Sequence, residues 1–278
     1  MFEYHIHSSF SVDSQAVMTE VCNQAVDVGI TEIAFTEHVD FIPEEVNTGY
    51  FDYEPYIAEI ECCRKLFEGR LTILMAAEMD YCFDFESEMR DWLDSRELDF
   101  VVGSVHYLRG RGNISEPRAE DFFSGRSVTE VYTPYFEQVL CAAKSGLFDS
   151  LGHLDLIKRY GVKTYGPFDP IEFEDQIRVI LQTIIDGGVC LELNTSGIRQ
   201  GPKEMYPCES VVAMYREMGG ELITTGSDSH RAKDAGNGLT EAYEMLERQG
   251  FDSVMSFRNR RGSAVALADV VSSPSVIH

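Results

Sequence analysis

The sequence predicts an α/β fold in which strands and helices alternate around a parallel sheet. Short apolar runs rich in strand-forming residues alternate with longer segments of helical period, giving seven or eight strand-helix units in 278 residues. Runs such as residues 99–105 (DFVVGSV) are apolar almost throughout, as expected for strands covered on both faces. No Gly-x-Gly-x-x-Gly follows the first run, so a closed, TIM-like (β/α) barrel is favoured over an open doubly wound sheet.

Each element follows from this alternation. The expected strands cover residues 2–7, 32–38, 71–79, 99–108, 149–157, 189–197, 221–230 and 253–257. The expected helices cover residues 14–28, 54–67, 85–95, 129–144, 171–186, 210–218 and 234–248. Three connections exceed the usual short loop, at residues 39–53, 109–127 and 159–170. Each follows the end of an expected strand, where barrels carry lids and specificity elements.

Composition narrows the class of protein. The chain has 44% hydrophobic residues and no interdomain linker, so we expect one domain, with a core of about residues 1–267 and a tail at 268–278. A formal charge of -24 disfavours nucleic-acid binding. Neither a signal peptide nor an uncharged apolar run of ~18 residues occurs, which predicts a soluble, cytoplasmic protein without a membrane partner. The seven scattered cysteines predict neither disulfides nor a thiolate zinc site, and nothing predicts the oligomeric state.

The histidines gather at one end of the expected strands. Six of the seven lie where a strand ends: His5, His7, His38, His106, His153 and His230. Because the carboxyl ends of barrel strands form the rim on which active sites are built, we expect these six side chains to share one site. His5 and His7 are two residues apart on a strand, so both project from the same face.

Carboxylates at the same strand ends turn this pattern into a predicted metal site. Glu78 closes one apolar strand and Asp228 closes another, and a buried carboxylate requires a cation or strong hydrogen bonds. His5, His7, Glu78 and Asp228 complete one site. His106 and His153 suggest a second ion that shares Glu78, and a third ion can lie between Asp13, His38 and His230. Imidazole and carboxylate ligands without thiolates point to Zn, Mn or Fe.

Simpler interpretations exist for each residue taken alone. His5 and His7 can be a hydrogen-bonded core pair, Glu78 can pair with an Arg or Lys, and Asp228 can cap the next helix. Other hydrolytic chemistries lack their sequence signatures: there is no Cys-x5-Arg, no Asp-x-Asp and no Gly-x-Ser-x-Gly. Hydrolysis by metal-activated water therefore remains the prediction.

The strand-end segments resemble the PHP-domain metallophosphoesterases and, within that family, the histidinol-phosphatase group. The matching segments are HIHSSFSVD, FTEHVD, AAE, GSVH, LGHLDLIKRYG, LELNTSGIR and GSDSH, spread from about residue 5 to residue 257. The resemblance implies a distorted (β/α)7 barrel with a metal site of two or three ions at the strand ends. It assigns the metal ligands as above, although some relatives carry His at the position of Asp13. It also implies that Arg159 and Arg199 contact the substrate phosphate, which suits a guanidinium fork.

The resemblance implies hydrolysis of L-histidinol phosphate to L-histidinol and phosphate, in histidine biosynthesis. Asp13, Asp40 and His230 are the candidates for the general acid that protonates the leaving oxygen. In the loop at residues 39–53, the carboxylates of Asp40, Glu44, Glu45 and Asp52 can pair with the cationic end of this substrate.

Three alternatives remain open. One keeps the site but changes the substrate to another small phosphomonoester or a nucleotide. An amidohydrolase also begins with His-x-His but usually places a Lys on its fourth strand, and DFVVGSVH has none. A metal-binding or regulatory protein without catalysis is the third alternative, and the complete ligand set argues against it.

Overall fold

The computed structural model describes residues 1–115 and 120–271 of the chain. Seven parallel strands form one sheet that curls into a nearly closed barrel, in the order β1-β2-β3-β4-β7-β8-β9. They are β1 (Phe2–Ile6), β2 (Glu32–His38), β3 (Thr72–Asp80), β4 (Phe100–Ser104), β7 (Ser150–Leu151), β8 (Cys190–Asn194) and β9 (Ile223–Gly226). The expected distorted (β/α)7 barrel is confirmed.

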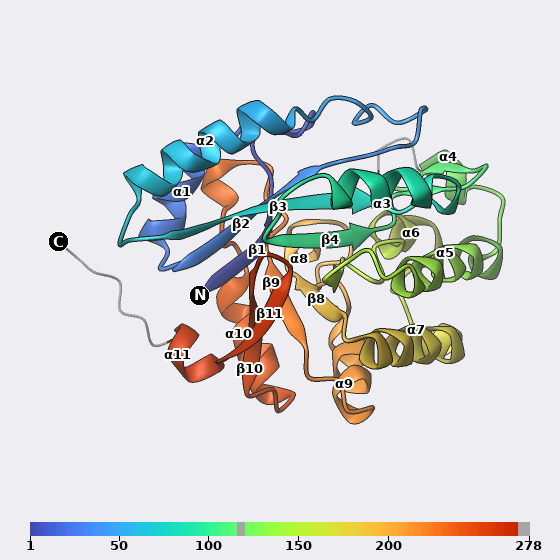
Figure 1. Cartoon of the computed structure of the whole chain (residues 1–278). Helices are drawn as coiled ribbons and strands as arrows, with labels where there is room; N and C mark the ends of the chain where they lie inside the picture. The colour runs from blue at the N-terminus through green and yellow to red at the C-terminus, as the bar shows by residue number, and fades with distance from the viewer. Residues whose placement is uncertain (116–119, 272–278) are drawn as a thin grey trace.

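Helices lie outside the strands, as Figure 1 shows for α1, α2, α5, α7 and α9. The helices expected from the sequence are α1 (Met18–Asp27), α2 (Tyr53–Leu66), α3 (Glu86–Asp94), α5 (Val128–Lys144), α7 (Glu174–Gly187), α9 (Glu209–Glu217) and α10 (Leu239–Arg248). Helix α7 illustrates why these segments are helical. Its buried residues Ile177, Ile180, Leu181 and Ile184 fall on one face, and Gly188 ends it in a left-handed conformation.

The long connections contain more structure than expected. The segment 159–170 is not a loop throughout, because α6 (Lys158–Tyr165) occupies most of it. The segment 109–127 contains β6 (Gly112–Asn113), which forms a short hairpin with β5 (Tyr107–Leu108), and it also contains α4 (Glu120–Phe123). The expected strand at 149–157 is only two residues long, and α8 (Ser196–Arg199) begins where a strand was expected to continue. Sequence period alone cannot detect such short elements.

A hairpin closes the barrel at the amino-terminal ends of its strands. The last expected strand is β10 (Ser253–Arg258), and it pairs antiparallel with β11 (Arg261–Ala266), which the sequence did not predict. Phe257 of β10 packs against Tyr4 and Phe100 inside the barrel. The last described helix, α11 (Leu267–Val271), includes residues 268–271 of the expected tail, and 272–278 lie outside the described residues. Side chains such as Phe257, Tyr4 and Phe100 therefore fill this end of the barrel.

Within residues 1–115 and 120–271, no helix combines the length and the apolar character that crossing a membrane requires.

Candidate metal centre

Glu78, near the end of β3, lies at the centre of the rim and is buried. Its carboxylate oxygens lie 3.1 to 3.5 Å from nitrogens of five of the six rim histidines. The five are His5, His7, His38, His106 and His153. Parallel pairing explains this convergence, because His38 of β2 is in register with Glu78 of β3 and the neighbouring strands end at the same level.

The rim side chains form overlapping groups in which all candidate ligand atoms lie within 4.8 Å of one another. The groups are His5, His7 and Glu78; Glu78, His106 and His153; His7, His38 and His230; and His5, His153 and Asp228. Asp13 completes the third expected group, since its carboxylate lies 3.5 Å from His38 Nε2 and 3.1 Å from His230 Nε2. The structure therefore brings together every residue that the sequence predicted as a metal ligand.

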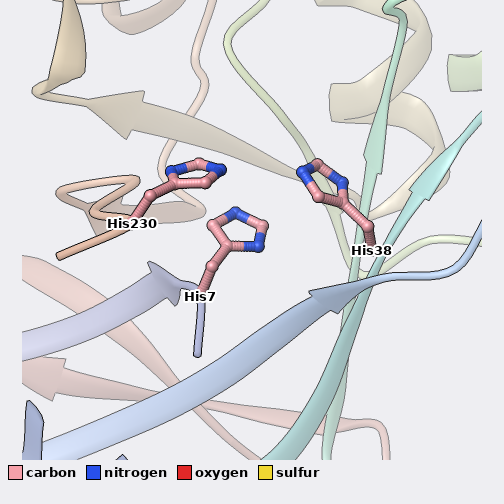
Figure 2. A group of neighbouring side chains, drawn as sticks. All are labelled: His7, His38 and His230. Carbon is pink, nitrogen blue, oxygen red and sulfur yellow. The ribbon is translucent and has the colours of Figure 1, made fainter. Parts of the chain in front are cut away.

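Three imidazoles of this cluster come from three different segments. Figure 2 shows His7 at the end of β1, His38 at the end of β2 and His230 beyond β9, with their rings around one space. The ring of His7 lies 4.4 Å from that of His38 and 4.2 Å from that of His230, measured between centroids. The ring of His7 therefore lies between the other two, where a positive charge on His38 or His230 opposes protonation of His7.

Unpartnered nitrogens show that the cluster fits metal ions. Four buried ring nitrogens make no hydrogen bond within the described residues: Nε2 of His5, Nε2 of His7, Nδ1 of His38 and Nδ1 of His153. The salt bridges described for Glu78 and Asp228 all join histidines, with no Lys or Arg among them. Buried imidazole nitrogens beside buried carboxylates are, once the imidazoles are neutral, the donor set that binds zinc and similar divalent ions.

Hydrogen bonds on the far side of two rings fix which nitrogen faces this space. His5 Nδ1 lies 2.5 Å from a carboxylate oxygen of Glu192 and donates to it, which turns Nε2 toward Glu78. Ser11 donates its proton to Glu37 at 2.6 Å, so its oxygen accepts from His7 Nδ1 at 3.1 Å. Both rings thus direct Nε2 toward Glu78, and Nε2 is the atom that a metal ion would use.

Charges within the cluster depend strongly on one another. Burial opposes ionisation of Glu78, but the charges of His5, His38 and His106 outweigh it and hold its pKa well below the usual range. Burial also opposes protonation of His38, yet Glu78 and Asp13 raise its pKa to about 10. For His7, burial and the neighbouring histidines lower the pKa to about 3. Without metal ions, protons on part of the cluster balance its carboxylates.

The sequence analysis missed the buried carboxylates that surround the ligands. Glu192 on β8 contacts His5 and also accepts a hydrogen bond from the backbone N–H of His153 at 2.6 Å. Asp80 accepts from the N–H of His106 at 2.7 Å. The available signal was a charged residue inside an apolar strand, as in LELN, because such a residue is buried only with a partner.

A cavity of about 360 Å³ opens above the cluster. Arg159, Asp40 and Glu45 are among the residues that line it. Asp40 is buried and accepts a hydrogen bond from the N–H of Asp80 at 3.3 Å. Glu45 accepts one from the side chain of Asn113 at 2.6 Å. The cavity therefore offers both a cation and carboxylates to a ligand.

The other predicted binding residues do not line this cavity. Arg199 donates to the backbone carbonyl of Ser227 at 2.6 Å and to that of Asn237 at 3.4 Å. Glu44 and Asp52 are exposed and absent from the cavity wall. The acidic loop thus contributes only two of its four carboxylates, Asp40 and Glu45, to the cavity.

The model of the PHP domain matches residues 3–196, which is more than half of the chain. The chain belongs to the PHP domain family. It is 29% identical to a histidinol-phosphatase from Lactococcus lactis, over 92% of this chain and 93% of that protein. It is 30% identical to a probable histidinol-phosphatase from Deinococcus radiodurans, over 92% and 96% of the two chains.

Solved structures agree with this family membership. The histidinol phosphate phosphatase of Lactococcus lactis, crystallised with zinc, L-histidinol and phosphate, superposes with a TM-score of 0.86 and 27% identity. The match covers 94% of this chain and 98% of that one. A putative histidinol phosphatase from Listeria monocytogenes, 22% identical with a TM-score of 0.75, shares the PHP-domain fold.

Proposed function

We propose that this protein is a histidinol-phosphatase, which hydrolyses L-histidinol phosphate to L-histidinol and phosphate. One observation carries the proposal: over nearly its full length the chain matches a relative crystallised with zinc, L-histidinol and phosphate. The buried His and carboxylate cluster at the rim supports the same chemistry. A phosphoric monoester hydrolase of this class requires no protein nucleophile, in keeping with the absence of the other hydrolytic signatures.

The cluster holds the metal ions in this proposal. His5, His7, Glu78 and Asp228 hold the first ion, His106 and His153 join Glu78 at the second, and Asp13, His38 and His230 hold the third. When bound, zinc or a similar ion lowers the pKa of water and neutralises charge on the phosphoryl oxygens. Glu192 and Ser11 orient His5 and His7 toward that position.

Arg159 binds the phosphate in this proposal, because it lines the cavity and its guanidinium can donate two parallel hydrogen bonds. Arg199, which the resemblance also assigned to the phosphate, acts instead on the backbone beside Asp228. Asp40 is the candidate that donates a proton to the leaving oxygen, since it lines the cavity and belongs to none of the ligand groups. Asp13 and His230 contact each other and are occupied as ligands.

The carboxylates that line the cavity suit the other end of the substrate. L-Histidinol phosphate carries a primary amine, which is cationic at neutral pH. Glu45 lines the cavity together with Val46, Asn47, Asn113 and Ser115, and its carboxylate can receive that amine. All seven cysteines are free, which supports a reducing compartment such as the cytoplasm for this reaction.

The test is release of inorganic phosphate from L-histidinol phosphate and from a panel of other phosphomonoesters and nucleotides. Chelated protein and protein reconstituted with Zn, Mn or Fe are compared, with Glu78→Gln as the control. We expect metal-dependent turnover that strongly favours L-histidinol phosphate. Equal or faster turnover of another ester would overturn the substrate, and turnover no better than the Glu78→Gln variant would overturn catalysis.

A further inference from the structure

The barrel has a seam between its first and last strands. The sheet runs from β1 to β9, and among the described residues these two edges are joined by one isolated bridge, between Ile6 and Ser229, rather than by a ladder. The seam passes through the proposed metal centre, because His5 and His7 lie on its β1 side and Asp228 lies on the other. The distance between these ligands depends on what holds the two edges together.

Backbone hydrogen bonds cross the seam at the level of the ligands. The N–H of Asp228 donates to the carbonyl of His5 at 2.7 Å, and the N–H of His7 donates to the carbonyl of Ser229 at 2.9 Å. Between them Asp228 has a φ of 49°, in the left-handed region that a residue with a Cβ rarely adopts. A conformation of this kind persists only where the surroundings hold it.

Glu3 supplies a side chain where the ladder is missing. It lies on β1 two residues before His5, so it projects from the same face, and it is fully buried. One of its carboxylate oxygens accepts from the N–H of Ser227 at 2.7 Å and from that of His5 at 3.3 Å. The other accepts from the N–H of Gly236 at 3.2 Å. Glu3 therefore connects β1 to two points of the segment that carries Asp228.

The peptide groups beside Asp228 are held from two directions. Glu3 accepts from the N–H of Ser227, and Arg199 donates to the carbonyl of the same residue at 2.6 Å. Both carboxylate oxygens of Glu3 are occupied by backbone donors, and Glu3 belongs to none of the candidate ligand groups. Its interactions are directed at the backbone next to a ligand and not at the cavity.

We propose that Glu3 is a positioning residue, which closes the barrel seam and holds Asp228 in the conformation that binds metal. This inference rests on the proposed role of Asp228 as a ligand. A glutamine at this position cannot serve all three donors, because its amide nitrogen accepts no hydrogen bond. Either the N–H of Ser227 or the N–H of Gly236 then loses its acceptor. Glu3 would in that case be joined to the segment that carries Asp228 at one point instead of two.

Glu32 provides a matched control. It is also a nearly buried glutamate on a barrel strand, but it bonds to Tyr4, Ser256 and Arg258 at the closed end of the barrel. Zinc affinity of the chelated protein is measured by competition with a chromophoric chelator, and Tm by calorimetry, for Glu3→Gln and Glu32→Gln. We expect Glu3→Gln to lose about 10- to 100-fold in zinc affinity, as for other groups that orient ligands. Glu32→Gln should lower Tm and leave zinc affinity unchanged.

The proposal is overturned if Glu3→Gln binds zinc as tightly as the wild type, or if Glu32→Gln loses zinc affinity equally. Should Glu3→Gln fail to fold, Glu3→Asp keeps the charge but shortens the reach, and it should also weaken zinc binding; unchanged affinity there overturns the proposal. These comparisons need no substrate. A failure of histidinol phosphate turnover in the wild type would therefore overturn the proposed function and leave this test intact.

Discussion

Gly226, the last residue of β9, faces His5 across the seam, and its replacement by alanine should displace that ligand. A Cβ at Gly226 would lie 2.3 Å from the Cβ of His5 and 3.0 Å from its backbone nitrogen. Ordinary contact begins at 3.4 Å, so one of the two strands must move by about 1.1 Å. Neither obstructing atom can rotate away, because one is backbone and the other is attached to it.

The displacement sets the expected size of the effect. Overpacking of this kind costs about 1–3 kcal/mol of stability, and a ~1 Å misplacement in an active site costs about 100-fold in rate. We therefore expect Gly226→Ala to fold with a lowered Tm and to lose about 100-fold in kcat/KM for L-histidinol phosphate. Steady-state phosphate release and calorimetry measure the two quantities, and zinc content is measured on the same samples.

Gly187→Ala is the matched control for this substitution. A Cβ at Gly187, near the end of α7, would lie 3.8 Å from Val189, which is ordinary contact. It should leave both Tm and kcat/KM near the wild-type values. A Gly226→Ala protein with wild-type activity and zinc content would refute the inference that the β1 and β9 edges set the position of His5.

Three further predictions concern the cavity and its ions. Arg159→Lys should lower kcat/KM about 10- to 100-fold and weaken inhibition by inorganic phosphate, because a lysine cannot form the paired hydrogen bonds; unchanged phosphate inhibition would contradict this. Glu45→Gln should raise KM about tenfold for L-histidinol phosphate but not for its analogue without the amine. Glu44→Gln, at an exposed neighbour outside the cavity, should leave both KM values unchanged. Equal effects of Glu45→Gln on both esters would refute a contact with the amine. Zinc binding to the chelated protein should release protons, and the affinity for zinc should rise with pH. The carboxylates of Glu78 and Asp13 outweigh burial and raise the pKa of His38 to about 10, so His38 is protonated at pH 7, whereas a histidine that binds metal must be neutral. Calorimetric titrations in two buffers of different ionisation enthalpy measure this release, and identical heats would contradict it.

The sequence predicts the site as well as it predicts where the strands end. A parallel barrel brings all carboxyl ends of its strands to one rim, so locating the strands was enough to bring six histidines, Glu78 and Asp228 together. The predicted strand at 32–38 has the bounds of β2, with His38 as its last residue. The metal ligation itself remains a prediction, since it depends on ions and not on the fold.

The residues that the sequence did not reveal act across the barrel. Glu192 reaches from β8 to His5 on β1, and Glu3 reaches from β1 to Ser227 beyond β9. Neither contact follows from periodicity, because the partners are more than 180 residues apart in the sequence. For Arg199 the sequence predicted a contact that the structure does not show. The resemblance placed it near the phosphate, whereas in the structure its guanidinium donates to the backbone carbonyl of Ser227.

The central claim is that the rim cluster binds the ions on which histidinol phosphate hydrolysis depends. The most direct test titrates zinc into chelated protein and follows bound zinc and phosphate release from L-histidinol phosphate in the same samples. The account predicts that activity appears only as zinc binds, and that Glu78→Gln neither retains the full zinc complement nor turns over. Full activity in the chelated protein, or wild-type turnover by Glu78→Gln, would contradict it.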